Sequence, residues 1–220
     1  MKKGWKIALT IGIILLIGGG VTYAMGFDKN YFERQENKKY NEEYTSPAKR
    51  NDSFVKFKSH NKHFSIDLPK DFEISEKFHE KGSDFFELFL AVKSDTETSK
   101  YGDWSDISVM YEVLEGDDLT SAIDILLDDN SFNGQHEVTN QNELTIYTGE
   151  SHYDSDKKQN LDPKEHGTNV FFAMVIEDSS REAVQVHFSL GCHNDKNKCG
   201  IDEEHSRETF RKIVNSITFE

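Results

Sequence analysis

Alternation of apolar and polar residues is the dominant pattern through most of the chain. Phe64, Ile66 and Leu68 alternate with polar residues, and Pro69 follows them. This period of two predicts a strand with one buried face. The segment 85–93 is apolar on both faces, which favours a central strand that is covered on both sides. The same reasoning predicts further strands at 71–77, 107–114, 143–149, 169–177 and 183–190.

Two segments have helical spacing instead. The apolar residues of 119–127 recur at i, i+4, i+7 and i+8, and Asp118 is placed to cap the first turn. A closing helix follows Asp202, and its apolar stripe comprises Phe210, Ile213, Val214 and Ile217. The order of four strands, a helix, three strands and a helix predicts an α+β domain over residues 54–220, an antiparallel β-sheet with packed helices.

The N-terminal residues 1–27 have a different pattern. Ile7 to Met25 form a run of 19 uncharged residues, which as a helix would be about 28 Å long against a hydrocarbon core of about 30 Å. Three lysines precede the run, so the positive-inside rule places the N-terminus in the cytoplasm and the rest of the chain outside the cell. We therefore predict a single-pass signal anchor that crosses the lipid bilayer through residues 7–25.

A cleaved signal peptide is the alternative for this segment. The basic start, the apolar run and the small residues near Ala24 resemble a cleavage site. Tyr23 and Met25 are bulky for such a site, and the run is long, which favours the uncleaved anchor. No cysteine stands directly after the run, so we do not expect a lipid on cysteine to hold the chain. Cleavage near Ala24 would make the protein a secreted one.

Charge separates the remaining chain into a linker and an acidic body. Residues 28–53 are highly charged with nearly balanced sign, and we interpret them as a stalk, helical as far as Tyr44, whose aromatics lie on a partly ordered linker. The whole chain has 26 Lys and Arg against 40 Asp and Glu, a net charge of -14. Such a surface repels nucleic acid, so no nucleic-acid partner is predicted.

The chain has two cysteines, Cys192 and Cys199, which six residues separate. In an oxidising space outside the cytoplasm this pair predicts a disulfide that closes a short loop. A zinc site with His193 is the alternative, but no second Cys/His pair stands at ligand spacing. We predict the disulfide, and no metal site.

Residues that would carry other chemistry are few. Nine histidines are scattered without an HExxH motif or a paired helical spacing. Gln185, His187 and Ser189 form the more polar face of the strand at 183–190, which we interpret as a solvated face, with a ligand groove as the alternative. The chain has no GxSxG elbow, no SxxK pair and no phosphate-binding glycine loop. Neither catalysis nor a cofactor is predicted.

Both ends of the predicted domain resemble a known superfamily. Leu68-Pro69 followed by Phe72, and the pattern Phe-x-x-Ile-Val-x-Ser-Ile-x-Phe at 210–219, are similar to the ends of PsbP/Mog1-like domains. The resemblance spans about residues 54–220 and implies an antiparallel sheet between helices, an α/β/α sandwich. Members are mainly accessory or binding proteins, such as photosystem lumen subunits and a small-GTPase binder, without a shared catalytic motif. The anchored form resembles uncharacterised exported proteins of Gram-positive bacteria.

These observations predict a membrane-anchored extracytoplasmic binding or accessory module that contacts an unidentified protein partner at the bacterial cell envelope, without catalysis. The alternative is a secreted or anchored hydrolase, or a small-ligand or cation-binding protein, that acts at the cell wall. A deep pocket where His187 converges with acidic residues would favour the alternative. A filled, convex sheet face would count against it.

Overall fold

The computed structural model describes residues 31–48, 53–82, 84–93, 101–102, 104–114, 118–191 and 200–220. The predicted membrane segment 7–25 and the predicted Cys192–Cys199 disulfide lie outside these ranges. Among the described residues, no helix combines the length and the apolar character needed to cross a membrane.

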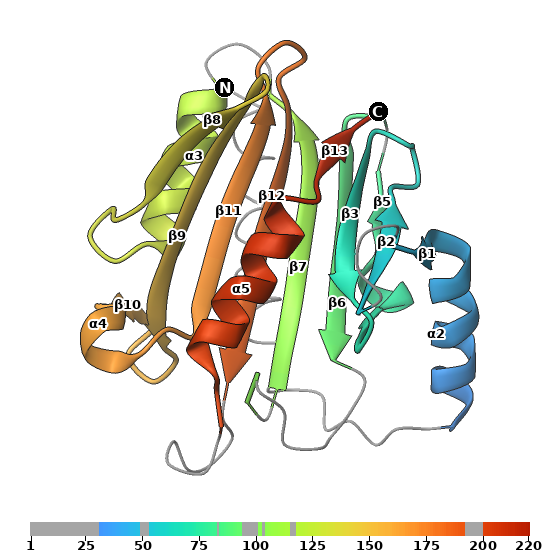
Figure 1. The fold of residues 1–220 in the computed structure, drawn as a ribbon, viewed down its shortest axis with the longest axis horizontal. Helices are drawn as coiled ribbons and strands as arrows, with labels where there is room; N and C mark the ends of the chain where they lie inside the picture. The colour runs from blue at the N-terminus through green and yellow to red at the C-terminus, as the bar shows by residue number, and fades with distance from the viewer. Residues whose placement is uncertain are drawn as a thin grey trace.

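A nine-stranded antiparallel sheet is the largest unit of the described chain (Figure 1). Its order is β10-β9-β11-β12-β7-β6-β4, with β5 paired to β6 and β8 paired to β9. The strands are β4 (Phe72–Ile74), β5 (Glu80–Lys81), β6 (Phe86–Lys93), β7 (Trp104–Val113), β8 (Glu137–Gln141), β9 (Leu144–Asp154), β10 (Gln159–Leu161), β11 (Val170–Glu177) and β12 (Glu182–Gly191).

A second, four-stranded sheet has the order β1-β2-β3-β13. Its strands are β1 (Thr45–Pro47), β2 (Phe54–Lys58), β3 (Phe64–Pro69) and β13 (Thr218–Phe219). The small sheet and α5 (Glu203–Val214) pack on one face of the large sheet, which we call the first face (Figure 1). Pro69 ends β3 and Phe72 begins β4, so the chain passes from the small sheet to the large one within three residues.

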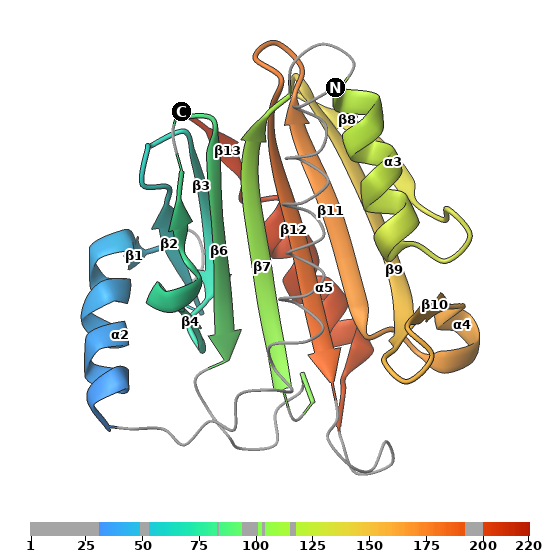
Figure 2. The same ribbon diagram turned by 180° about the vertical axis from the view of Figure 1, so that it is seen from behind.

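The other helices lie around the two sheets. Helix α3 (Asp118–Asn130) packs on the opposite side of the large sheet, which we call the second face (Figure 2). Helix α2 (Tyr31–Tyr44) lies at the outer side of the small sheet, α4 (Pro163–His166) lies beside β10, and the 3-10 helix η1 (Glu76–Phe78) precedes β5.

Aromatic packing between the two sheets forms the core on the first face. Phe57 and Phe89 are fully buried, and their ring centroids are 4.3 Å apart. The predicted stripe of α5 is buried against the same cluster. Asp202 caps this helix, because its Oδ1 accepts a hydrogen bond of 3.0 Å from the backbone N–H of His205. The closing helix therefore forms and packs as its sequence pattern predicts.

Helix α2 is fastened to the domain at its C-terminal half. Tyr40 and Tyr44 are only 9% exposed and belong to the first-face core. The side chain of Asn41 bonds both backbone groups of Ile74, accepting from its N–H at 2.7 Å and donating to its carbonyl at 2.9 Å. This side chain thus satisfies backbone groups of β4 as a neighbouring strand would. Here the segment that we expected to be a partly ordered linker packs into the core.

The predicted α+β class and antiparallel sheet are confirmed. Every strand predicted from period-two patterns is present, as β3, β4, β6, β7, β9, β11 and β12, and both predicted helices are present as α3 and α5. The prediction did not include the short or polar strands β1, β2, β5, β8, β10 and β13. Strand β7 begins at Trp104 rather than at residue 107, and this difference bears on the site described below.

Candidate binding face of the large sheet

The central strands β7 and β12 carry polar side chains on the second face. Because side chains alternate between the faces of a sheet, strand register decides which of them meet. Asp106 lies opposite Ser189, and Ser108 lies opposite His187. The six polar residues that share this face are called the polar row: Asp106, Ser108, Glu112, Gln185, His187 and Ser189.

Two side-chain hydrogen bonds lie within the polar row. Ser189 Oγ and His187 Nδ1 share a hydrogen bond of 3.1 Å. Gln185 Nε2 donates to Glu112 Oε1 at 2.7 Å, which links β12 to β7. Such bonds are what buried polar groups in a folded protein require. They orient His187 and Glu112 on the sheet.

Asp106 lacks such a partner. The residue is 0% exposed, and neither of its carboxyl oxygens makes a hydrogen bond. Burial raises the pKa of this carboxyl well above its usual range, because the charged form loses its hydration. An unpaired buried carboxyl costs stability, so its presence in a folded protein needs an explanation.

Burial disfavours charge at two other members of the polar row. It lowers the pKa of His187 to about 4. It raises the pKa of Glu112, against the opposing effect of the hydrogen bond from Gln185. The row therefore offers hydrogen-bonding groups in surroundings that disfavour an isolated charge.

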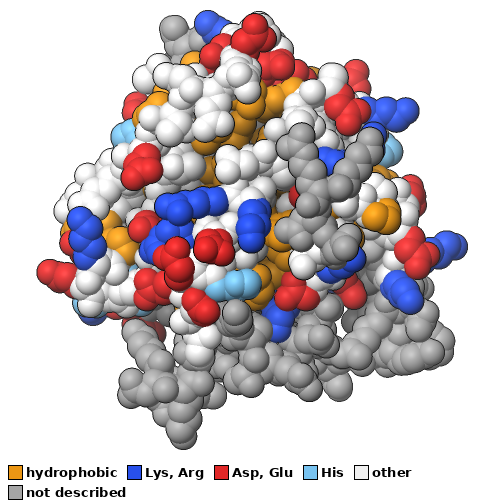
Figure 3. Space-filling view, viewed as in Figure 1, with side chains coloured by type: hydrophobic (Ala, Val, Ile, Leu, Met, Phe, Trp, Pro, Cys, Tyr) orange, Lys and Arg blue, Asp and Glu red, His pale blue; other side chains and the backbone are white. Residues whose placement is uncertain are grey.

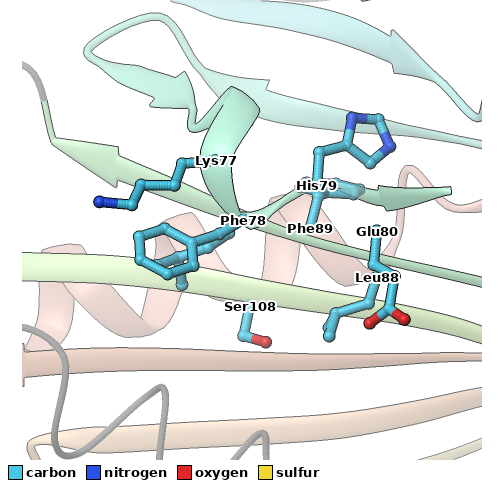
Figure 4. A pocket seen from close by; sticks show the side chains of 8 residues that line it. Lys77, Phe78, His79, Glu80, Leu88, Phe89 and Ser108 are labelled. Atoms are coloured by element: carbon cyan, nitrogen blue, oxygen red, sulfur yellow. The ribbon is translucent and has the colours of Figure 1, made fainter.

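A pocket of about 330 Å³ adjoins the polar row at Ser108 (Figure 4). This volume lies at the lower end of the range for small-molecule sites, about 300–1,000 Å³. In Figure 4 the phenyl ring of Phe78 and the side chain of Leu88 border the space above the Ser108 hydroxyl, with Lys77 at one end and Glu80 at the other. The pocket thus combines an apolar wall with polar groups at its floor and ends.

Two aromatic rings on the second face lie across glycines. A Cβ atom at Gly191 would stand 1.8 Å from Cε2 of Trp104, and one at Gly149 would stand 2.2 Å from Cζ of Phe172. Register places Trp104 opposite Gly191 and Phe172 opposite Gly149. The glycines allow these rings to approach the backbone on either side of the polar row.

Replacing Gly149 with alanine is expected to lower the free energy of unfolding by about 1–3 kcal/mol. The added methyl group would overlap the ring of Phe172, which is 0% exposed and has no room to move. Urea unfolding of the purified domain measures the change. The matched control is Gly200→Ala, whose methyl group would meet nothing within 4 Å. Equal stability of both variants would contradict this prediction.

The side of the molecule that carries α5 has a different character. Figure 3 shows basic and acidic side chains next to one another on this side. Arg207 donates to Glu150 at 2.9 Å and to Glu204 at 3.0 Å. These paired, solvated charges are typical of an ordinary helix surface and carry little binding energy. Asp106, whose two carboxyl oxygens both lack a hydrogen bond, is on the second face.

A second polar cluster joins α2 to the large sheet, and we call Glu87, His79 and Tyr40 the helix clasp. Glu87 Oε1 accepts a hydrogen bond of 2.7 Å from His79 Nε2, and His79 Nδ1 accepts one of 2.6 Å from the hydroxyl of Tyr40. The side chains of His79 and Glu87 are 0% and 1% exposed. In Figure 4 the imidazole of His79 points away from Ser108. The imidazole therefore faces α2, although His79 is also one of the residues that line the pocket.

The described histidines do not converge on a metal centre. Within the described ranges, no three His, Cys, Asp or Glu side chains are grouped so that they could hold a metal ion. His60 Nδ1 lies 3.5 Å from the hydroxyl of Tyr44, and His63 Nδ1 lies 3.2 Å from Glu182. These two histidines, three residues apart in sequence, have separate surroundings.

Comparison with known proteins places this architecture in a family. A family model with the description "Putative lipoprotein YvcA" matches residues 35–218. The chain belongs to the YvcA_Mog1p family. The resemblance to PsbP/Mog1-like domains that the sequence predicts is thereby confirmed. The match to the YvcA_Mog1p model includes most of α2, in agreement with the burial of Tyr40 and Tyr44.

Individual relatives are more distant. "Putative lipoprotein YvcA" of Bacillus subtilis (strain 168) is 29% identical over 98 residues, which are 44% of this chain and 39% of that protein. The alignment thus spans about two fifths of the relative's length. The crystal structure of the Saccharomyces cerevisiae Ran-binding protein Mog1p superposes with a TM-score of 0.43 at 10% identity, over 75% of this chain and 94% of the yeast protein.

The structure of this YvcA_Mog1p chain brings the predicted ligand-face residues Gln185, His187 and Ser189 together on one face. Ser189 is buried, so the face is not the fully solvated one that we expected. Sequence reasoning missed Asp106, because the predicted strand began one residue after it. The signal was present as polar residues at the alternate positions 106, 108 and 112. Only the register of β7 against β12 shows that both sets share a face.

Proposed function

We propose that this protein is an extracytoplasmic accessory module of the bacterial cell envelope that binds a protein partner through the second face of its large sheet, without catalysis. The description of its family as a lipoprotein supports a membrane-anchored or exported protein. The first cysteine of this chain is Cys192, so residues 7–25 are the segment that we propose as the anchor.

The polar row is the observation that carries this proposal. A sheet face that served only as a packing surface would be apolar, whereas this face holds six polar side chains, one of which is a carboxyl without a partner. Polar groups that converge beside a pocket are typical of binding sites. On this face the described residues include no group of three His, Cys, Asp or Glu side chains that could hold a metal ion.

The proposed anchor would hold the domain near the membrane, and this position limits which proteins could be the partner. Only five residues, 26–30, separate the proposed anchor from α2. A chain of this length spans at most about 17 Å. Because α2 is fastened to β4 through Asn41, the domain would stay close to the outer surface of the bilayer. A membrane protein with segments exposed on that surface is therefore the partner that we propose.

The pocket supports a second candidate function, the binding of a small ligand. Its volume is about 330 Å³, and Ser108 in its lining lies opposite His187 on the neighbouring strand, but His187 itself does not line it and Glu80 is the one acidic residue among the described lining residues. In this case the module would sequester or sense a small molecule at the cell wall. The same face would be used, so one experiment separates the two functions.

Site-specific photocrosslinking in intact cells tests the proposal. A photoreactive phenylalanine analogue replaces Phe78 in the pocket wall, and in a control chain it replaces Val138, which is 48% exposed on β8. We expect Phe78 to capture one envelope protein that the control does not. Identical captures from both positions, or none from Phe78, would contradict a protein partner at this face. A small-molecule adduct at Phe78 would favour the second candidate.

A further inference from the structure

We infer that the polar row receives a basic side chain, a lysine or an arginine, from the protein partner, with Asp106 as its counter-charge. This inference rests on the proposed function, because it assigns the chemistry of the group that the second face binds. It goes beyond that function in stating which residue of the face recognises the partner and which charge the partner must present.

The immediate neighbours of Asp106 do not neutralise it. Ser189 and Val92 lie opposite Asp106 on the adjacent strands, and Trp104 and Ser108 precede and follow it on the same face of β7. None of these four side chains carries a positive charge. A carboxylate in such surroundings is stabilised strongly by an incoming cation, since Coulomb attraction increases as the local dielectric constant decreases.

The pocket provides a route for a long basic side chain. Leu88, Leu90 and Phe78 form an apolar wall along which the methylene stem of a lysine or arginine would pack. Ser108 lies at the floor of the pocket. Asp106 precedes it by two residues on β7, which is a distance of about 7 Å along the strand. Asp106 lies beside the pocket and is 0% exposed, so the charged head of such a stem would displace the side chains between the pocket and the carboxyl as it binds.

A basic side chain fits better than a metal ion or an acidic group. Metal ions need several oxygen or nitrogen ligands, and the described residues hold no such group at this site. The negative charge of an acidic group would be repelled by Asp106 and Glu112, and no positively charged side chain of the polar row would offset this repulsion. The net charge of -14 also favours encounter with a basic segment of a partner.

Model compounds allow the inference to be tested on the full chain in detergent. The probe is N-acetyl-lysine methylamide, and the control probe is N-acetyl-norleucine methylamide, which has an apolar side chain in place of the lysine side chain. Binding is followed by NMR through the methyl group of Met110, which lies on the second face between Ser108 and Glu112. The test variant is Asp106→Asn, and the matched control is Asp156→Asn, an exposed turn residue.

We expect the lysine probe to shift the Met110 signal of the unmodified chain and of Asp156→Asn, and to bind Asp106→Asn at least tenfold more weakly. The norleucine probe should also bind at least tenfold more weakly. Equal binding of the lysine probe to all three chains, or equal binding of both probes, would overturn the inference.

The crosslinking experiment separates this inference from the proposed function. If Phe78 captures the envelope protein equally well in the Asp106→Asn chain, the partner exists but Asp106 does not recognise it, and the inference fails alone. If the lysine probe binds through Asp106 but Phe78 captures no protein in cells, the cation site stands and the protein partner is wrong. Free amines would then be the ligands to examine.

Discussion

Replacing Glu87 with alanine is expected to lower the free energy of unfolding by about 3–5 kcal/mol, the usual cost of removing one member of a buried polar pair. The Glu87 carboxylate accepts hydrogen bonds from His79 Nε2 at 2.7 Å and from the backbone N–H of His60 at 2.9 Å. Alanine would leave the buried ring N–H of His79 without an acceptor and would remove the acceptor of the His60 backbone N–H. Urea unfolding followed by circular dichroism measures the loss.

The same substitution should also loosen α2, because Tyr40 bonds to the His79 ring that Glu87 orients. Hydrogen exchange of the α2 amides is expected to accelerate in Glu87→Ala. Glu87→Gln is the matched control, since its amide retains an acceptor oxygen for one of the two donors and should be less destabilising. If the free energy of unfolding of Glu87→Ala lies within about 1 kcal/mol of that of the unmodified protein, the helix clasp contributes little to stability.

Replacing Asp106 with asparagine is expected to stabilise the protein increasingly as pH rises. Because burial raises the pKa of Asp106, the folded state keeps a proton that the unfolded state releases near pH 4. Above that pH the unmodified chain loses about 1.4 kcal/mol of stability per pH unit until the folded-state pKa is reached. Asparagine carries no titrating proton, so this loss disappears.

The effect of His187 on the pH dependence of stability is opposite to that of Asp106. Its pKa is lowered to about 4 in the folded state, so its contribution to stability is present above about pH 6.5 and is lost as the pH falls towards 4. Glu112, whose pKa is also raised by burial, acts in the same direction as Asp106. Between pH 4 and 6.5 the gain in stability from His187 and the losses from Asp106 and Glu112 therefore oppose one another.

Unfolding measurements at pH 5, 6.5 and 8 check these opposing effects. The stability difference between Asp106→Asn and the unmodified chain should increase from the lowest to the highest pH. A constant difference would show that Asp106 titrates normally in the folded protein. The variant that is expected to lose the basic ligand is thus also expected to be the more stable one, as is usual when a binding site holds a destabilising group.

Local patterns predict the central part of this fold and not its edges. Strand β11 is buried along nearly its whole length and appears as an apolar run, whereas β8 is exposed at all five residues and has no period to detect. The docking of α2 also leaves little trace in sequence, because it depends on Asn41 meeting the backbone of Ile74. Such a contact between segments 33 residues apart follows from tertiary structure alone.

Only the β12 part of the candidate site was predictable from the sequence. The alternate polar residues of β12 were identified, because a polar face within an apolar strand is visible in a single segment. Their meeting with Asp106 and Ser108 required the pairing register of two strands about 80 residues apart. One residue of slippage would place Asp106 on the first face. Register is therefore the information that single-segment patterns lack.

The position of Trp104 makes the proposed site observable by its own fluorescence. The ring lies across Gly191 and shares the second face with Asp106, two residues away. The chain has two tryptophans, and the other is Trp5 in the N-terminal segment. In a Trp5→Phe chain all indole emission would originate beside the polar row. A cation that reached Asp106 would change the electric field at this ring, so the emission wavelength would report occupancy without an attached dye.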